Sequence, residues 1–221
     1  MTHLSEAIDE AKADIKSRLA NVDPEEQKQI LLSRRKILAQ MGVPKRYREV
    51  AFDTYDVNYN NNKAKVSEIE KLVEQGKWIV LSGKQTGIGK THLAISAMGR
   101  LSHIKSIPNR KCLFVNLRSE GERLLMAGLE RENIIRDWLS YKCLLIDELG
   151  REPDKMINTV ERIIDVFYNE MKSLIITTPL SKKELREDER YDGSILRRIT
   201  DCGKIIEMTG KTYRLASKDA R

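Results

Sequence analysis

The sequence predicts an α/β fold in which a five-stranded parallel sheet lies between helices, preceded by a short N-terminal helical appendage. Two observations carry this prediction. Short segments rich in apolar and β-branched residues recur after residue 77, at 78–82, 112–116, 143–147, 174–178 and 205–208. Amphipathic helical patterns separate most of these segments. Strands that are almost continuously apolar and alternate with helices are typical of a parallel sheet covered on both faces.

The N-terminal 42 residues carry helical patterns only. Apolar residues recur at three- and four-residue spacing over 4–20, and a second helix is expected from about residue 23 to residue 41. We therefore divide the chain into an N-terminal helical segment, 1–42, and a main domain, 43–221. The first segment is interpreted as a docking element for a partner protein. The alternative is a hairpin that packs on the main domain.

Composition limits the function classes. The net charge is +7, which fits a polyanionic partner such as nucleic acid, although surface charges that do not cancel would give the same total. No apolar run approaches the roughly 20 residues that span a bilayer, and no secretory signal is visible. Because Cys112, Cys143 and Cys202 lie far apart, neither a disulfide framework nor a zinc site is expected. These features predict a cytoplasmic protein.

A glycine-rich segment follows the first predicted strand and precedes a predicted helix. Glycines allow backbone N–H groups to converge on phosphate oxygens at a helix N-terminus. Lys90 is expected to reach the β- and γ-phosphates of ATP, and the Thr91 hydroxyl to ligate Mg²⁺. The predicted ATP-binding residues of this segment are Gly83, Lys84, Gln85, Thr86, Gly87, Ile88, Gly89, Lys90, Thr91 and His92.

This segment departs from the usual spacing of a phosphate-binding loop. The pattern G-x-x-x-x-G-K-[ST] requires glycine at position 84, whereas this chain has Lys84 there and glycine one place earlier, at Gly83. The loop therefore either contains one extra residue or accepts Lys84 at its first turn.

Two adjacent carboxylates, Asp147 and Glu148, end the third predicted strand. Their position indicates the carboxyl edge of the sheet, beside the phosphate-binding loop. Asp147 is expected to hold Mg²⁺ and its water shell, and Glu148 to orient and deprotonate the attacking water.

Further polar candidates come later in the chain. Thr178, at the end of the fourth predicted strand, is the candidate for contacting the γ-phosphate or the attacking water, although a strand-end threonine is also ordinary turn chemistry. Arg197 and Arg198 are candidates for an arginine finger that acts on ATP held by a neighbouring subunit, and Arg198 is preferred. The alternative is a pair of surface cations on a helix.

In these motifs the sequence resembles the DnaC/DnaI group of AAA+ replicative helicase loaders and the similar IstB-type transposition ATPases. The resemblance covers roughly residues 36–215. It is carried by an approach segment, the phosphate-binding loop, the acid pair, the fourth strand, the Arg198 region and a C-terminal motif, at 43–52, 86–94, 145–150, 175–178, 194–199 and 210–214.

The resemblance implies a P-loop NTPase of AAA+ type, with strands in AAA+ order, ATP bound between protomers and Arg214 as a sensor of the nucleotide state. It also implies that helices between residues 117 and 141 contact single-stranded DNA, with a solvated helical face as the alternative. Pro179 stands where the family usually has a sensor asparagine, and Ser194 where it often has an arginine. The candidate DNA-binding residues are Arg118, Arg123, Arg131 and Arg136.

The leading functional hypothesis is an ATPase that binds the replicative DNA helicase and single-stranded DNA, uses ATP with Mg²⁺, and forms a homo-oligomer when ATP is bound. One alternative is an IstB-type regulator of transposition that binds duplex DNA. Another is a nucleotide-gated adaptor with little hydrolysis, which Pro179 and the irregular loop favour.

Overall fold

The computed structural model describes residues 23–213 except 59, 61 and 192. The helix expected at 4–20 and the candidate sensor Arg214 therefore lie outside the described residues. Within them, five parallel strands form one sheet in the order β2-β3-β4-β1-β5. The strands are β1 Trp78–Ser82, β2 Cys112–Asn116, β3 Cys143–Asp147, β4 Ser173–Thr177 and β5 Gly203–Glu207. The predicted sheet and its AAA+ strand order are confirmed, with strand ends displaced by at most two residues.

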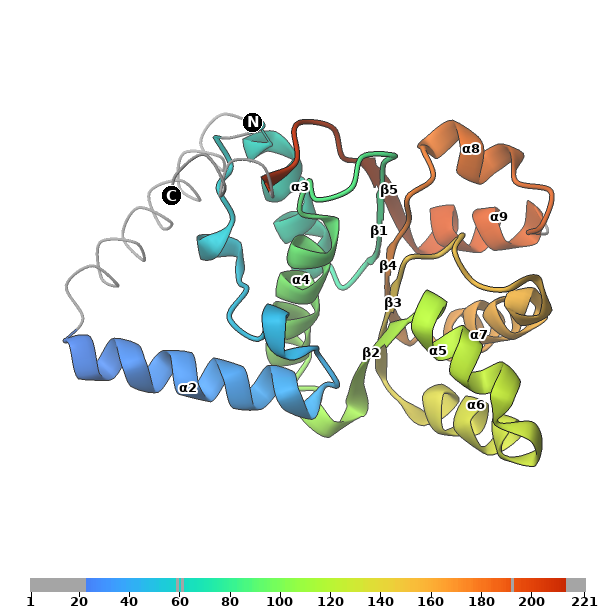
Figure 1. Ribbon diagram of the computed structural model, residues 1–221. Coiled ribbons are helices and arrows are strands. Elements are labelled where there is room, and N and C mark those ends of the chain that lie inside the picture. Colours follow the sequence, from blue (N-terminus) through green and yellow to red (C-terminus); the bar gives the residue numbers. More distant parts are fainter. Residues whose placement is uncertain (1–22, 59, 61, 192, 214–221) are drawn as a thin grey trace.

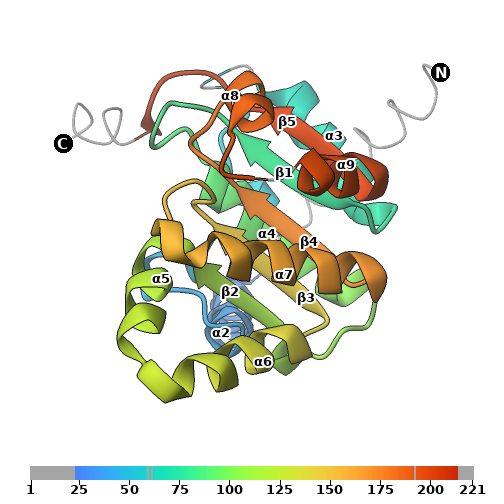
Figure 2. The ribbon, with the colours of Figure 1, turned by 90° about the vertical axis from the view of Figure 1, so that its right-hand side faces the viewer.

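Helices cover both faces of the sheet, as Figures 1 and 2 show. One face carries α3 Lys63–Glu74 and α4 Lys90–Ile104, and the other carries α5 Leu117–Met126, α6 Arg131–Ser140, α7 Ile157–Asn169 and α9 Gly193–Cys202. The short α8 Lys182–Glu187 follows β4. Single 3₁₀ turns are η1 Lys45–Tyr47, η2 Phe52–Thr54, η3 Asn109–Lys111, η4 Gly128–Glu130 and η5 Asp154–Met156.

Each face of the sheet buries its own apolar core. On one side the core includes Ile69 of α3 and Leu93 of α4, and on the other it includes Ile163 of α7 and Ile199 of α9. Strands β1, β3 and β4 are buried at every position, which explains why their sequences are apolar on both faces. In the part of the chain that the structure describes, no helix is both long enough and apolar enough to cross a membrane.

Helix α2, Pro24–Gln40, extends along the α3–α4 side of the molecule (Figure 1). Its C-terminal end belongs to the main core, because Leu38 and the following Met41 are buried there and the Met41 carbonyl accepts a hydrogen bond of 2.8 Å from Phe114 N. The middle of the helix exposes apolar side chains to solvent, namely Ile30, Leu31, Leu32 and Ile37. Helix α2 is thus anchored at its C-terminal end and exposes apolar side chains along its middle.

Candidate nucleotide site

A pocket of about 480 Å³ lies at the carboxyl ends of the parallel strands. Its wall combines the phosphate-binding loop, the ends of β3 and β4, the start of α5 and the segment around η1 and η2. This is where ligands bind in open α/β sheets, since loops leaving parallel strands diverge there and leave a crevice.

The phosphate-binding loop is held in a conformation that requires glycine. Gly87 and Gly89 have φ values of +77° and +95°, and a Cβ atom on Gly89 would lie 2.3 Å from the Tyr55 ring. Lys90 begins α4, and its Nζ donates hydrogen bonds of 2.6 Å and 2.8 Å to the carbonyls of Gly83 and Gln85. Burial lowers the pKa of Lys90 to about 8, against the opposing effect of the Asp147 carboxylate. The ammonium therefore lies under the loop, facing the pocket.

The irregular start of the loop has a steric cause. Gly83 has a φ of +145°, and a Cβ atom there would lie 2.4 Å from the Met208 carbonyl oxygen. Glycine is thus required at 83 rather than at 84. The Lys84 side chain turns away toward α8, where its Nζ lies 2.7 Å from Glu184 Oε1 and lowers the pKa of that carboxyl to about 2.

The structure accordingly divides the predicted ATP-binding residues into two sets. The pocket wall includes Thr86, Gly87, Gly89, Lys90, Thr91 and His92. Gly83, Lys84, Gln85 and Ile88 are not part of it. Ile88 is fully buried in the core, and Lys84 is corrected from a pocket residue to the partner of Glu184.

The Asp147 carboxylate is buried and accepts three hydrogen bonds. Its Oδ1 accepts from the hydroxyls of Thr91, at 2.9 Å, and Thr177, at 2.7 Å, and its Oδ2 accepts from Asn116 Nδ2 at 3.0 Å. Glu148 lies beside it on the pocket wall with a φ of +66°, which is unusual for a residue with a side chain. The two neighbouring acids are therefore held in different environments, one buried and the other on the pocket wall.

The donor set fits a magnesium ion that is shared with a bound nucleotide. The Thr91 hydroxyl and the Asp147 carboxylate adjoin each other and provide the hard oxygen ligands that Mg²⁺ prefers. Among the residues that the structure describes, no group of three or more His, Cys, Asp or Glu side chains gathers to form an all-protein cage. Mg²⁺ is usually held by one or two protein oxygens together with substrate phosphates, so this set is sufficient.

Thr178 lines the pocket, and so does the neighbouring Thr177. The Thr178 hydroxyl is buried and donates a 2.7 Å hydrogen bond to the Leu149 carbonyl, so it stabilises the turn after β3. Thr177 contacts the acid pair directly. Its hydroxyl donates to Asp147 and accepts a 3.0 Å hydrogen bond from Glu148 N, which links it to both acids.

The two candidates for the arginine finger differ in their contacts. The Arg198 guanidinium lies 2.7 Å from both Asp165 of α7 and the Ser194 hydroxyl, and its side chain is only 23% exposed. Arg197, one residue earlier on α9, is exposed, and its side chain has no hydrogen-bond or ion-pair partner in the described part of the chain.

The four arginines predicted to bind DNA differ in their contacts. Arg118 lines the nucleotide pocket, and Arg131 donates hydrogen bonds of 3.1 Å to Lys155 O and Thr159 Oγ1, which fastens α6 to α7. Arg123 pairs with Glu120 at 2.6 Å, and Arg136 donates to Asn133. Arg118, Arg123 and Arg136 are nevertheless solvent-exposed, whereas Arg131 is largely committed to α7.

Sequence reasoning missed several residues in or beside the pocket. It missed Asn116, which binds Asp147, because asparagine at a strand end is common, and Arg151, which lines the pocket, because nothing in its spacing is distinctive. The aromatic wall was missed too. Tyr55 donates a 3.1 Å hydrogen bond to Ile88 O, Tyr213 N donates to Gly87 O, and the two rings lie 5.4 Å apart.

Comparison with known proteins connects this geometry to a family. The family of IstB-like ATP binding proteins matches residues 1–220. A replicative helicase loader DnaC from Buchnera aphidicola subsp. Acyrthosiphon pisum (strain APS) is 26% identical over 159 residues, which are 68% of this chain and 64% of that protein. The match thus spans less than two thirds of that relative's length.

Solved structures agree with the fold. The crystal structure of a DnaC helicase loader has a TM-score of 0.61 and 26% sequence identity, and the match covers 75% of this chain and 100% of that one. A crystal structure of DnaI also has a TM-score of 0.61, with 20% identity over 76% of this chain and 96% of that one. At that lower identity the second likeness concerns the fold alone.

Proposed function

The chain belongs to the family of IstB-like ATP-binding proteins, an AAA+ P-loop family, and we propose that it is an ATP-hydrolysing loader of a replicative DNA helicase. The observation that carries the proposal is the convergence of Lys90, Thr91, Asp147 and Glu148 on one pocket at the carboxyl edge of the sheet. The similarity to DnaC over 68% of the chain favours replication as the setting, and with it a cytoplasmic location.

In this proposal each side chain has one task. Lys90 binds the β- and γ-phosphates, and Thr91 and Asp147 hold Mg²⁺, which neutralises charge on the phosphates when bound. Glu148 orients the attacking water and accepts its proton. Thr177 fixes both acids through its single hydroxyl, a role supported by its hydrogen bonds to Asp147 and from Glu148 N.

A neighbouring protomer completes the site. Because Arg197 is exposed on α9 and has no partner within the described residues, we assign it, rather than Arg198, as the arginine finger that reaches ATP bound by the next chain. ATP would then favour a homo-oligomer, since it contacts both chains.

The helicase partner is assigned to the apolar surface of α2. Its exposed Ile30, Leu31, Leu32 and Ile37 are supported by a firmly anchored helix end and suit a protein partner. Single-stranded DNA is assigned to the α5–α6 region through its exposed arginines Arg118, Arg123 and Arg136, and the net charge of +7 favours this contact.

The test is ATP-dependent transfer of a purified hexameric helicase onto circular single-stranded DNA by the full chain. Lys90→Ala is expected to abolish transfer by preventing ATP binding. Leu32→Asp should prevent capture of the helicase while leaving ATP binding intact, and Lys36→Asp, on the exposed part of the same helix, is the matched control. If the helicase is neither captured nor transferred by the unmodified chain, the loader proposal is wrong.

The family match over residues 1–220 favours one alternative, a transposition regulator of the IstB type. That function predicts ATP-driven assembly on duplex DNA that grows with DNA length, and it requires no helicase. The nucleotide-gated adaptor remains the third alternative. If Glu148→Gln leaves the ATPase rate unchanged, hydrolysis does not depend on this site and the adaptor is favoured.

A further inference from the structure

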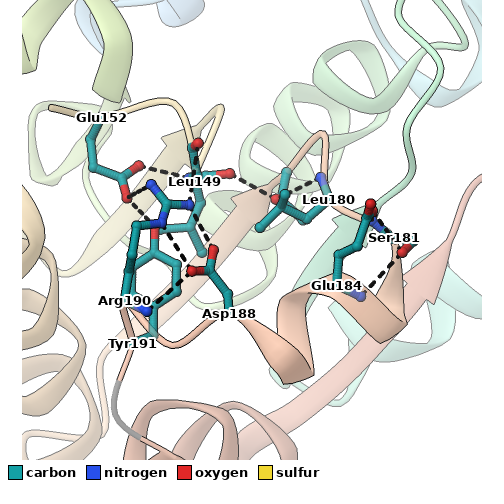
Figure 3. A network of polar contacts seen from close by, with 10 residues as sticks. Leu149, Glu152, Leu180, Ser181, Glu184, Asp188, Arg190 and Tyr191 are labelled. Atoms are coloured by element: carbon teal, nitrogen blue, oxygen red, sulfur yellow. Dashed lines mark hydrogen bonds and ion pairs between the residues drawn. The ribbon is translucent and has the colours of Figure 1, made fainter. Parts of the chain in front are cut away.

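A buried carboxylate, Glu152, joins the turn after the acid pair to the segment that leads into α9 (Figure 3). Its side chain is 0% exposed. Glu152 Oε2 accepts a 2.7 Å hydrogen bond from Gly150 N, and Oε1 accepts a hydrogen bond from the Tyr191 hydroxyl. Gly150 follows Glu148 by two residues, whereas Tyr191 precedes the first residue of α9 by two. One side chain therefore connects the hydrolytic turn with the helix that carries Arg197.

The α9 side of this connection is firmly held. Arg190 pairs with Asp188 through two hydrogen bonds of 2.9 Å and 2.6 Å, and its Nη1 lies 4.0 Å from Glu152 Oε1. Its Nη2 also donates to the Gly150 carbonyl at 3.5 Å. Burial and the Glu152 carboxylate raise the pKa of Tyr191, so its hydroxyl keeps its proton and remains a donor. Two consecutive residues before α9 thus contact the turn.

The turn itself depends on these contacts. Glu148 has a left-handed backbone conformation, with a φ of +66°, which costs free energy and persists only where the surroundings enforce it. Three successive N–H groups enforce it. Those of Glu148 and Leu149 donate to Thr177, and that of Gly150 donates to Glu152. Loss of the Glu152 carboxylate would release the third of these anchors.

The position of α9 is set by the same network and by the core. Ile195 and Ile199 are buried in the core on this face of the sheet and fix the rotation of α9 about its axis. Arg197 consequently points to solvent. The start of the helix is fixed by Tyr191 through Glu152. The turn with Glu148 and the segment that leads into the helix with Arg197 are therefore linked through one side chain.

A buried carboxylate is a costly way to hold two segments together. Replacing buried charged groups with well-packed apolar residues is often neutral or stabilising, so a purely structural clamp does not need a charge at this point. A carboxylate, however, has two oxygens, and here each binds a different segment. This geometry provides coupling, which apolar packing of the same volume would not.

We propose that Glu152 is a positioning residue that couples the two halves of the ATPase reaction, holding Glu148 for the chain's own ATP and α9 for delivery of Arg197 to the neighbour. The inference rests on the proposed function, because it requires a finger that acts in trans. It also gives each oxygen of Glu152 a separate, testable task.

The test uses mixtures of full-length variants. Glu148→Gln lacks the base but keeps the finger, and Arg197→Ala lacks the finger but keeps the base, so mixing these two should restore ATPase activity well above that of either alone. Glu152→Leu, which is similar in volume but removes both acceptor oxygens, should restore activity with neither, because both of its halves are misplaced. Tyr191→Phe removes only the hydroxyl that links Glu152 to the segment before α9. It should restore activity when mixed with Glu148→Gln and fail when mixed with Arg197→Ala.

Binding of a fluorescent ATP analogue shows whether each variant retains a folded site, and Glu122→Leu, which replaces an exposed carboxylate on α5, is the matched control. Affinities within a few-fold of the unmodified chain are expected for Glu152→Leu and Tyr191→Phe. If Glu152→Leu fails to fold, the two Tyr191→Phe mixtures decide: activity with Glu148→Gln alone supports the coupling, and activity with both partners contradicts it.

Failure of the Glu148→Gln and Arg197→Ala pair to restore activity would overturn the trans finger, and the coupling with it. If that pair works but Glu152→Leu or Tyr191→Phe restores activity with both partners, the proposed function stands and the coupling is wrong.

Discussion

Two neighbouring threonines at the end of β4, Thr177 and Thr178, allow the effect of a lost hydroxyl on catalysis to be separated from its effect on stability. Thr177→Val and Thr178→Val remove one hydroxyl each from residues that are 2% and 0% exposed. The Thr177 hydroxyl binds both acids, whereas the Thr178 hydroxyl binds the Leu149 carbonyl and Leu180 N. The same substitution therefore removes two hydrogen bonds in each case, but only one of the two variants disturbs the acids.

The expected losses of stability are similar. A hydrogen bond to a charged group contributes about 1.5–3 kcal/mol and a neutral one about 0.5–1.5 kcal/mol. Thr177→Val, with one bond of each kind, should lower the free energy of unfolding by roughly 2–4 kcal/mol, and Thr178→Val, with two neutral bonds, by roughly 1–3 kcal/mol. The ranges overlap, so stability alone does not distinguish the two roles.

Turnover should distinguish them. Without the Thr177 hydroxyl, Asp147 loses a donor and Glu148 N loses its acceptor, and a misplacement of about 1 Å in a catalytic group costs on the order of 10²-fold in rate. Thr178→Val should retain kcat within a few-fold. The assays are urea unfolding, binding of an ATP analogue and steady-state ATPase activity at saturating ATP. If Thr178→Val loses more kcat than Thr177→Val while both remain folded, Thr177 does not position the acids.

Three further outcomes are expected. Arg197→Ala should lower kcat on the order of 10³-fold with normal ATP binding, whereas Arg198→Ala should mainly lower the melting temperature because it breaks the pair with α7; the reverse pattern would restore Arg198 as the finger. ATP affinity should fall as pH rises through about 8, because the phosphates bind the protonated form of Lys90 and the pKa of this lysine is lowered to about 8. Lys90→Arg stays charged over this pH range, so its ATP affinity should not depend on pH in this way. Gly89→Ala should lose ATP binding, since φ is +95° and the new Cβ would meet Tyr55 at 2.3 Å, whereas Gly193→Ala, with nothing within 4 Å, should bind normally in the same titration.

The fold was predictable because the buried strands are apolar on both faces, a pattern that few other structures produce. The choice between Thr177 and Thr178 was not. It depends on the register between β3 and β4, in which Ile146 pairs with Ile176, so that the next residue of each strand, Asp147 and Thr177, lie side by side. A sequence gives the alternation within a strand, but it does not give the register between two strands separated by a helix.

The roles of the arginines were unpredictable for a related reason. Arg197 and Arg198 are adjacent on one helix, but their contacts differ because the Arg198 guanidinium forms an ion pair with Asp165 on α7. Likewise, Arg131 fastens α6 to α7 instead of remaining free for DNA. The partner of a long charged side chain comes from another element. Helical periodicity shows which residues face the core, but it leaves such pairs undetermined.

The pocket contains two arginines of its own, Arg118 and Arg151, and this bears on the need for a neighbour. Both are exposed and line the site, so each chain supplies positive charge near the phosphates without assembly. A finger in trans would make specific activity rise with protein concentration, because assembly completes the site. Charge supplied in cis would keep it constant. A flat dependence would therefore assign charge neutralisation to Arg118 and Arg151 instead of Arg197, whereas a rising one would support Arg197 as the finger.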